Sequence, residues 1–206
     1  MMTNQKPPLE ANDIQSLEDV TERTLVLIKP DGVRRGLIGN VISRFESAGL
    51  KVCAIKMLVP SKELVSRHYT DSEDWLRGVG SKAKKSSEAK GIILKESEIE
   101  LGQKVRSRLI KYLSSGPVIC MAIEGNESIF AVRKMVGSTE PKSAEPSSIR
   151  GSLSTDSYGL ADSSERPIKN IIHASEDYAT ASAEIKLWFS ESELIEYKRA
   201  DEEIVY

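Results

Sequence analysis

Four short apolar runs, separated by segments with helical periodicity, constrain the fold of this chain more than any other feature. The runs are Thr24–Ile28, Val52–Val59, Val118–Ile123 and Ile168–Ile172. A short, continuous apolar run that ends at turn residues is typical of a strand buried on both faces. With 206 residues the chain is long enough for one substantial core and short for two. The pattern therefore predicts one domain around a small sheet.

Helical stripes lie between these runs. They predict helices over Gly39–Ala48, Ser61–His68, Glu127–Val136 and Ala179–Phe189. Ser61 suits the N-cap of the second helix, and Gly49 follows the first as its C-terminal cap. Apart from the additional helices, the order of elements predicts an α+β fold. We expect a ferredoxin-like split β-α-β sandwich, with a four-stranded antiparallel sheet, helices and insertions.

An N-terminal tail and three internal segments do not fit a minimal domain of this kind. Residues 1–22 are polar and predict a mobile N-terminal tail, so residues 23–206 form the single domain. Inserts at about 75–103 and 151–166 are rich in Lys, Ser, Glu or Asp and read as long irregular loops, and residues 137–149 form a hydroxyl-rich loop. Long loops in a compact domain are either functional or disordered.

Composition excludes several classes of protein. A net charge of −2 and a pI near 5.9 argue against specific nucleic-acid binding. No apolar run approaches the roughly 20 residues that cross a bilayer, and the first ten residues lack the apolar core of a secretory signal. Cys53 and Cys120 lie in apolar stretches, as expected of core residues in a reducing compartment. We therefore expect a cytoplasmic protein without membrane partners.

His173 is one of two histidines and stands at the end of a predicted strand. A lone histidine is more often structural, but Glu184 on the following helix changes that expectation. Glu184 lies at the edge of an apolar stripe, where a carboxylate needs a partner. A bond from one ring nitrogen of His173 would leave the other free as a nucleophile. Asn170 shares such a site only if it adopts a non-strand conformation.

Several cations and a hydroxyl could cradle a phosphate. Lys29 directly follows a buried strand, where α/β proteins commonly bind ligands, although most lysines before a turn are merely solvated. Arg133, Thr139 and Arg150 would complete the cradle, because guanidinium groups bind phosphate oxygens in pairs. Each arginine could also be a surface residue.

Taken together, these motifs closely resemble the nucleoside diphosphate kinase family. The shared elements are Lys29-Pro-Asp-Gly32, His68-Tyr69, Arg133 with Thr139, Ile149-Arg150-Gly151, and Asn170-Ile-Ile-His-Ala-Ser175 followed by Glu184. The resemblance runs from about Thr21 to the C-terminus with two interruptions. It implies a nucleotide phosphotransferase with a ping-pong cycle.

The resemblance also implies roles for individual residues. His173 matches the nucleophile that takes the γ-phosphate of a nucleoside triphosphate and passes it to a diphosphate. Glu184 and Ser175 match the groups that orient its ring, and Tyr69 matches a residue close to the transferred phosphate.

Further residues match the family's nucleotide contacts. Lys29 and Asn170 correspond to contacts at the ribose and phosphate end, Arg133 and Thr139 to β-phosphate contacts, and Arg150 to a γ-phosphate contact. Mg²⁺ bound through the nucleotide phosphates is implied as cofactor, and no protein metal ligands are expected.

The chain departs from the family pattern after Arg150-Gly151 and in the nucleotide lid. Ser152 stands where the family has Asp, and the aromatic that stacks on the base is missing from its usual place. Trp75 is a candidate for stacking, Leu109 for an apolar contact on the other face of the base, and Arg77 or Arg106 for the lid arginine.

Nucleoside di- and triphosphates are thus the expected ligands, and the resemblance implies a homo-oligomer, a hexamer or tetramer built from dimers. Two alternatives are a family member that phosphorylates or docks another protein through the 75–103 insert, and a paralogue without activity. The intact set of motif residues disfavours the second alternative.

Overall fold

The computed structural model of the protein describes residues 21–88 and 91–202. Its strands are β1 (Thr21–Ile28), β2 (Lys51–Leu58), β3 (Val118–Asn126) and β4 (Ile172–Ala174). Its helices are α2 (Pro30–Arg34), α3 (Ile38–Ser47), α4 (Lys62–His68), α5 (Glu73–Glu88), α6 (Glu98–Leu113), α7 (Ser128–Val136), η1 (Pro141–Ser143), α8 (Ile149–Leu153), α9 (Tyr158–Ser163), α10 (Tyr178–Trp188) and η2 (Glu191–Glu193). Most of the predicted N-terminal tail, residues 1–20, lies outside the described residues, and Thr21 and Glu22 already belong to β1.

The four strands form one antiparallel sheet in the order β2-β3-β1-β4. β1 pairs with β3 along its whole length but with β4 only from Val26 to Ile28. In that short pairing Leu27 lies opposite His173. This topology confirms the predicted α+β fold of the ferredoxin-like type, because β3 lies between β1 and β2, β1 lies between β3 and β4, and β2 pairs directly with β3.

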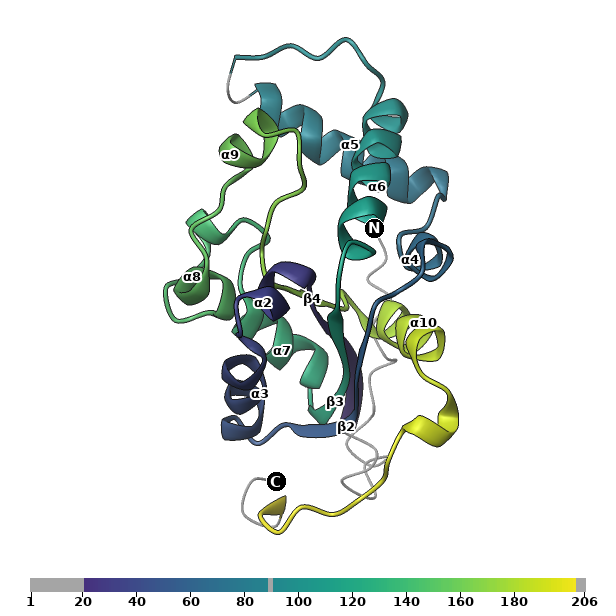
Figure 1. The fold of residues 1–206 in the computed structure, drawn as a ribbon, viewed down its shortest axis with the longest axis vertical. Coiled ribbons are helices and arrows are strands. Elements are labelled where there is room, and N and C mark those ends of the chain that lie inside the picture. Colours follow the sequence, from purple (N-terminus) through teal and green to yellow (C-terminus); the bar gives the residue numbers. More distant parts are fainter. Residues whose placement is uncertain (1–20, 89–90, 203–206) are drawn as a thin grey trace, which may run out of the picture.

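Both faces of β1 are buried, as its continuous apolar run predicts. Leu25 and Leu27 point into a core that α4, α6 and α10 cover. Val26 and Ile28 point into a second core under α3 and α7, on the opposite side of the sheet (Figure 1). Each such side chain contributes roughly 1.5–3 kcal/mol by leaving water. The central strand that leads to Lys29 is therefore held rigidly.

The expectation of an irregular insert at 75–103 is wrong, because this segment forms most of a helical hairpin, α5 and α6. Ser97 begins α6 with a capping box, which satisfies the free N–H groups of the first turn. The two helices pack closely at two glycines. A Cβ on Gly80 would lie 1.7 Å from the carbonyl oxygen of Glu98, and one on Gly102 would also meet backbone. These glycines therefore serve close packing and do not mark a loop.

Two further expectations need correction. The predicted strand Ile168–Ile172 is wrong in position, because a tight turn at Ile171 delays β4 until Ile172. The predicted loop at 151–166 is partly helical, since it holds the end of α8 and all of α9, and its carboxylate Asp156 pairs with Arg166. Within the described ranges, no helix is both long enough and apolar enough to cross a membrane.

Candidate active site

The turn before β4 separates Asn170 from the strand that holds His173, so strand alternation no longer dictates opposite sides for the two residues. Ile171 has a φ of 70°, and the N–H of Ile172 donates to the carbonyl of Asn170 at 2.7 Å. A hydrogen bond between residues two apart defines a γ-turn, and positive φ marks its strained form. Asn170 therefore precedes the strand in a non-strand conformation, as the sequence required for a shared site.

His173 meets the carboxylate predicted for it. Its Nε2 lies 3.0 Å from both carboxylate oxygens of Glu184, and the hydroxyl of Ser175 donates to Glu184 Oε2 at 2.6 Å. Burial by itself would raise the pKa of Glu184. The charge and hydrogen bond of His173 outweigh it, with smaller contributions from His68 and Ser175, and lower that pKa to about 2. Glu184 is thus a carboxylate at neutral pH and orients the ring through Nε2.

Both histidines of the chain meet at this site. The rings of His68 and His173 are 4.7 Å apart and nearly perpendicular. The indole N–H of Trp188 donates to His68 Nδ1 at 3.3 Å, and Glu184 Oε1 lies 3.4 Å from the same nitrogen. Burial, and next the charge of His173, lower the pKa of His68 to about 3. His68 is therefore a neutral ring at pH 7.

Sequence reasoning named His68 only as part of a motif and missed Trp188 as its partner. The scarcity of histidine was the available signal, because the chain has only two. Trp188 gave none, since its place on an apolar stripe is that of any core residue.

Lys29 and Asn170 are joined to the hydroxyl-rich loop. The ammonium of Lys29 donates to Asn170 Oδ1 at 2.7 Å, and Asn170 Nδ2 donates to the carbonyl of Thr139 at 2.8 Å. Burial, followed by repulsion from Arg150, lowers the pKa of Lys29 to about 7. This lysine thus lies in a site whose cations repel one another, as expected where an anion binds.

Arg150 is buried and bound to backbone carbonyls. Its guanidinium donates to Gly137 O and Ile172 O at 2.8 Å each, and to Asn170 O at 3.3 Å. It therefore ties the end of the hydroxyl-rich loop to β4. Burial lowers the pKa of Arg150, and the charge of Arg133, which lies exposed on α7, adds to that effect. The structure brings both arginines to the end of the sheet that carries His173.

The predicted lid residues lie on or beside the helical hairpin. Trp75 and Leu109 are partly buried against the core under α4 and α10, with the Trp75 ring 6.2 Å from that of Tyr69. Tyr69 itself is buried, which raises its pKa. Arg106 donates to the carbonyls of Ser66 and Tyr69 and so fastens the hairpin to α4.

Arg77 is exposed and pairs with Glu73 one turn earlier in α5. It therefore differs from Arg106, whose contacts bridge two elements.

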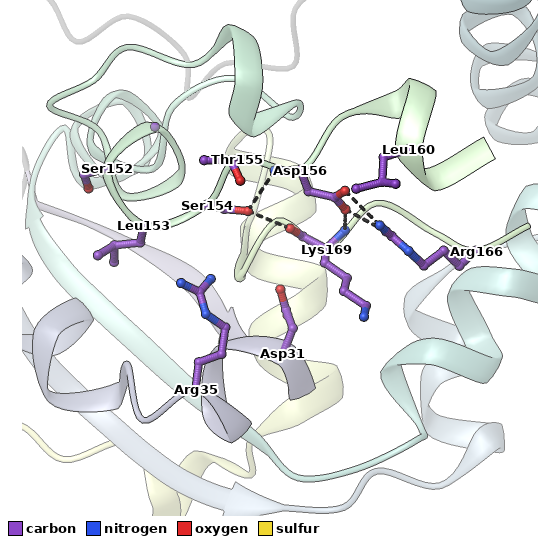
Figure 2. A pocket seen from close by; sticks show the side chains of 11 residues that line it. Asp31, Arg35, Ser152, Leu153, Ser154, Thr155, Asp156, Leu160, Arg166 and Lys169 are labelled. Carbon is purple, nitrogen blue, oxygen red and sulfur yellow. Dashed lines mark hydrogen bonds and ion pairs between the residues drawn. The ribbon is translucent and has the colours of Figure 1, made fainter. Parts of the chain in front are cut away.

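A cavity of about 490 Å³ opens between α2 and residues 151–169 and is shown in Figure 2. His173 does not line it, and of the Lys-Pro-Asp-Gly turn only Asp31 does. The hydrogen-bond network, and not this cavity, locates the site.

Among the described residues, His68, His173 and Glu184 could together reach a metal ion, with ligand atoms within 4.8 Å of one another. Two imidazoles and one carboxylate suit a transition metal better than Mg²⁺, which prefers oxygen ligands. Glu184 is moreover engaged by His173 and Ser175. The donor set therefore fits a Mg²⁺ ion only if nucleotide phosphates supply its oxygens.

Comparisons with known proteins identify the family of the chain. The family model for nucleoside diphosphate kinase matches residues 22–76 and 97–194. The nucleoside diphosphate kinase of Pyrobaculum aerophilum is 44% identical over 180 residues, which cover 85% of this chain and 98% of that relative.

Solved structures give the same result. A crystal structure of an NDP kinase from Pyrobaculum aerophilum has a TM-score of 0.83 and 42% identity, covering 85% of this chain and 100% of the other. A transition-state mimic of nucleoside-diphosphate kinase from Borrelia burgdorferi with bound vanadate and ADP has a TM-score of 0.73 and 41% identity, covering 89% and 96%. The family match skips residues 77–96, around the tip of the hairpin, and continues through 151–166. The chain therefore belongs to the nucleoside diphosphate kinase family.

Proposed function

We propose that this protein transfers the γ-phosphate of a nucleoside triphosphate to a nucleoside diphosphate through phospho-His173. The observation that carries the proposal is the pair formed by Glu184 and His173 Nε2, which leaves Nδ1 as the nucleophile. Nδ1 attacks the γ-phosphorus, and the bond from that phosphorus to the bridging oxygen breaks, so the nucleoside diphosphate leaves. A terminal oxygen of a second diphosphate then attacks the phosphohistidine, the P–N bond breaks, and the ring is regenerated.

Cations neutralise the charge that develops during both transfers. Lys29, Arg133 and Arg150 supply positive charge, while Thr139 and Asn170 contact the nucleotide. The ring of Tyr69 lies next to the rings of His68 and Trp75. Positioning and electrostatic stabilisation supply most of the catalysis in phosphoryl transfer. Mg²⁺ held by the nucleotide phosphates would add positive charge where the phosphoryl group is transferred. Trp75 and Leu109 are the candidates for contacts with the base.

Labelling with γ-phosphate-labelled ATP tests this function. The purified enzyme should carry an acid-labile phosphate that GDP removes, and His173→Gln should carry none. Lys62→Ala, at an exposed position of α4, is the control and should label like the wild type. Label that persists with GDP present, or label on H173Q, would reject the proposal. Omitting Mg²⁺ with a chelator should suppress labelling.

A homo-oligomer built from dimers, either a hexamer or a tetramer, is also proposed. β2 lies at the edge of the sheet, where Ile55 and Met57 are 50% and 57% exposed and Val59, just after the strand, is 64% exposed. An exposed apolar edge strand is a ready site for pairing with a second copy. Sedimentation should give a mass several times 22.8 kDa, and Met57→Lys should reduce it.

A cytoplasmic location is proposed as well. Cys53 and Cys120 are both buried free thiols, as is usual in a reducing compartment. Fractionation of the source cells with an antibody against the chain should recover it with the soluble fraction.

Docking of a protein partner is the second candidate function. Ile92 and Ile93, near the tip of the hairpin, are 53% and 85% exposed. A deletion variant tests this function. Only residues 84–95 are removed, so that the packed helical segments around Trp75 and Leu101 are kept. Loss of a bound partner with intact nucleotide exchange would favour docking, and loss of exchange with retained folding would favour a lid.

A further inference from the structure

Asp31 accepts hydrogen bonds from two distant parts of the chain. It lies in the first turn of α2, two residues after Lys29. Its Oδ1 accepts the phenol O–H of Tyr112 at 2.5 Å, and its Oδ2 accepts the backbone N–H of Ile171 at 3.0 Å. Figure 2 shows the side chain between those of Arg35 and Lys169. Neither bond is local, since the partners are 81 and 140 positions away.

Ile171 is the most strained of these partners. Positive φ is rare for any residue with a side chain and a genuine outlier for a β-branched one. Ile171 has a φ of 70° and is completely buried. Such a conformation persists only when the surroundings impose it. Something must therefore hold this turn in place.

The segment from Lys29 to Gly32 holds it at three points. The N–H of Lys29 donates to Ile171 O at 2.7 Å, while Asp31 accepts the Ile171 N–H, so both backbone polar groups of Ile171 are engaged. Gly32 packs directly against the turn, because a Cβ there would come within 3.0 Å of the Ile171 side chain. Of these contacts only the one to Asp31 is made by a side chain, so it can be changed by substitution.

The turn sets the directions of two side chains, Asn170 and His173. Asn170 precedes Ile171 and binds Lys29 and Thr139, while His173 follows two residues later and binds Glu184. In a regular strand Asn170 and His173 would face opposite sides. If the turn relaxed, Asn170 and His173 would leave their shared site.

We propose that Asp31 is a positioning residue for phosphoryl transfer, which holds the strained turn at Ile171 so that Asn170 and His173 face one nucleotide. This inference rests on the proposed function. Tyr112 lies in α6, so Asp31 also fastens the hairpin to the turn. Burial, together with the charge of Asp31 and the hydrogen bond to it, raises the pKa of Tyr112, which therefore remains a donor at physiological pH.

Four variants separate positioning from stability. Asp31→Ala removes both bonds. Asp31→Asn keeps an oxygen for the Ile171 N–H, and Tyr112→Phe removes only the bond to α6. Glu46→Ala, which removes one negative charge from an exposed position of α3, is the matched control. All are compared with the wild type at 25 °C, with the folded fraction measured by circular dichroism.

The first readout does not depend on activity. In ¹⁵N NMR spectra, D31A should lose the protection of the Ile171 amide against exchange and shift the His173 ring resonances, whereas E46A should change neither. The second readout is the rate of His173 phosphorylation by saturating ATP. D31A should be slowed by about tenfold or more, since small misplacements of reacting groups can cost up to about 100-fold. D31N should recover most of that loss.

A glycine at position 171 tests the strain directly, because glycine adopts positive φ without cost. Asp31→Ala combined with Ile171→Gly should phosphorylate faster than Asp31→Ala with Ile171→Ala, although both leave a similar cavity. Unchanged ring resonances and an unchanged rate in folded D31A would overturn the inference. Equal rates of the two double variants would overturn the strain argument. A wild type that takes no phosphate would reject the proposed function, while the NMR comparison would still decide the role of Asp31 in the turn.

Discussion

Lys29 should take up a proton when nucleotide binds, and the structure sets the size of that uptake. Burial and the charge of Arg150 lower its pKa to about 7, from an ordinary value of 10.5. That shift corresponds to roughly 5 kcal/mol against the ammonium form. A nucleotide polyphosphate near Lys29 favours the ammonium and raises the pKa again.

The expected stoichiometry follows from the pKa near 7. At pH 8 about a tenth of the free enzyme is protonated at Lys29, so ADP should bring uptake of about 0.9 proton. At pH 6 about nine tenths is already protonated, and the uptake should fall to about 0.1 proton. The affinity for ADP should therefore decrease as the pH rises above 7, until the pKa of the complex is passed.

Isothermal titration calorimetry of ADP in buffers of different ionisation enthalpy measures this uptake as a slope. Lys29→Gln keeps a donor for Asn170 but cannot change its charge, so its slope at pH 8 should be close to zero. Lys62→Gln, at an exposed position, should behave like the wild type. A wild-type slope near zero at pH 8, or an equal slope in K29Q, would refute the argument.

Three further predictions concern stability. Glu184→Gln should lower the free energy of unfolding by roughly 3 kcal/mol at pH 7 and make that free energy less dependent on acid. The reason is that the folded pKa of Glu184 near 2 lies below the usual 4.5, so its stabilisation is lost as the pH falls between these values. Unfolding by urea at several pH values measures this, and parallel curves for variant and wild type would contradict it. Gly80→Ala should lower the free energy of unfolding by about 1–3 kcal/mol, because the new methyl group would clash with the backbone of Glu98. Gly78→Ala, whose methyl group would meet nothing within 4 Å, should be neutral or stabilising. Equal unfolding midpoints for the two variants would contradict the packing role of Gly80. Ser97→Ala should cost about 1 kcal/mol by removing the cap of α6, checked by thermal unfolding, and no change would show that the cap is dispensable.

Local patterns in the sequence were sufficient to predict much of the fold and part of the candidate site. The continuous apolar run at Thr24–Ile28 predicted a strand buried on both faces, and that is where β1 lies. Glu184 on the edge of an apolar stripe predicted a partner for His173, and the two are in contact. Both inferences depend on periodicity and burial, which act over a few residues and can be read from the chain.

Other features arise only from contacts between distant segments. The Lys, Ser and Glu content of residues 75–103 indicated a loop, but Gly80 and Gly102 each allow close packing of one helix on the other. His68 is kept neutral by burial and by the charge of His173, and it accepts a hydrogen bond from Trp188, 120 positions along the chain. No local pattern encodes such a pairing, because it depends on how the sheet and its helices close around a core.

The turn before His173 shows both sides of this division. The three-residue spacing from Asn170 to His173 already required a non-strand conformation if both belonged to one site. It did not reveal that Ile171 takes a positive φ, or that Asp31 meets its N–H. Sequence by itself thus determined three of the four strands, the faces of the helices around them and the chemistry proposed at His173. Tertiary structure alone decided which distant groups hold that chemistry in place, because strained backbone is stabilised only by contacts that the finished fold provides.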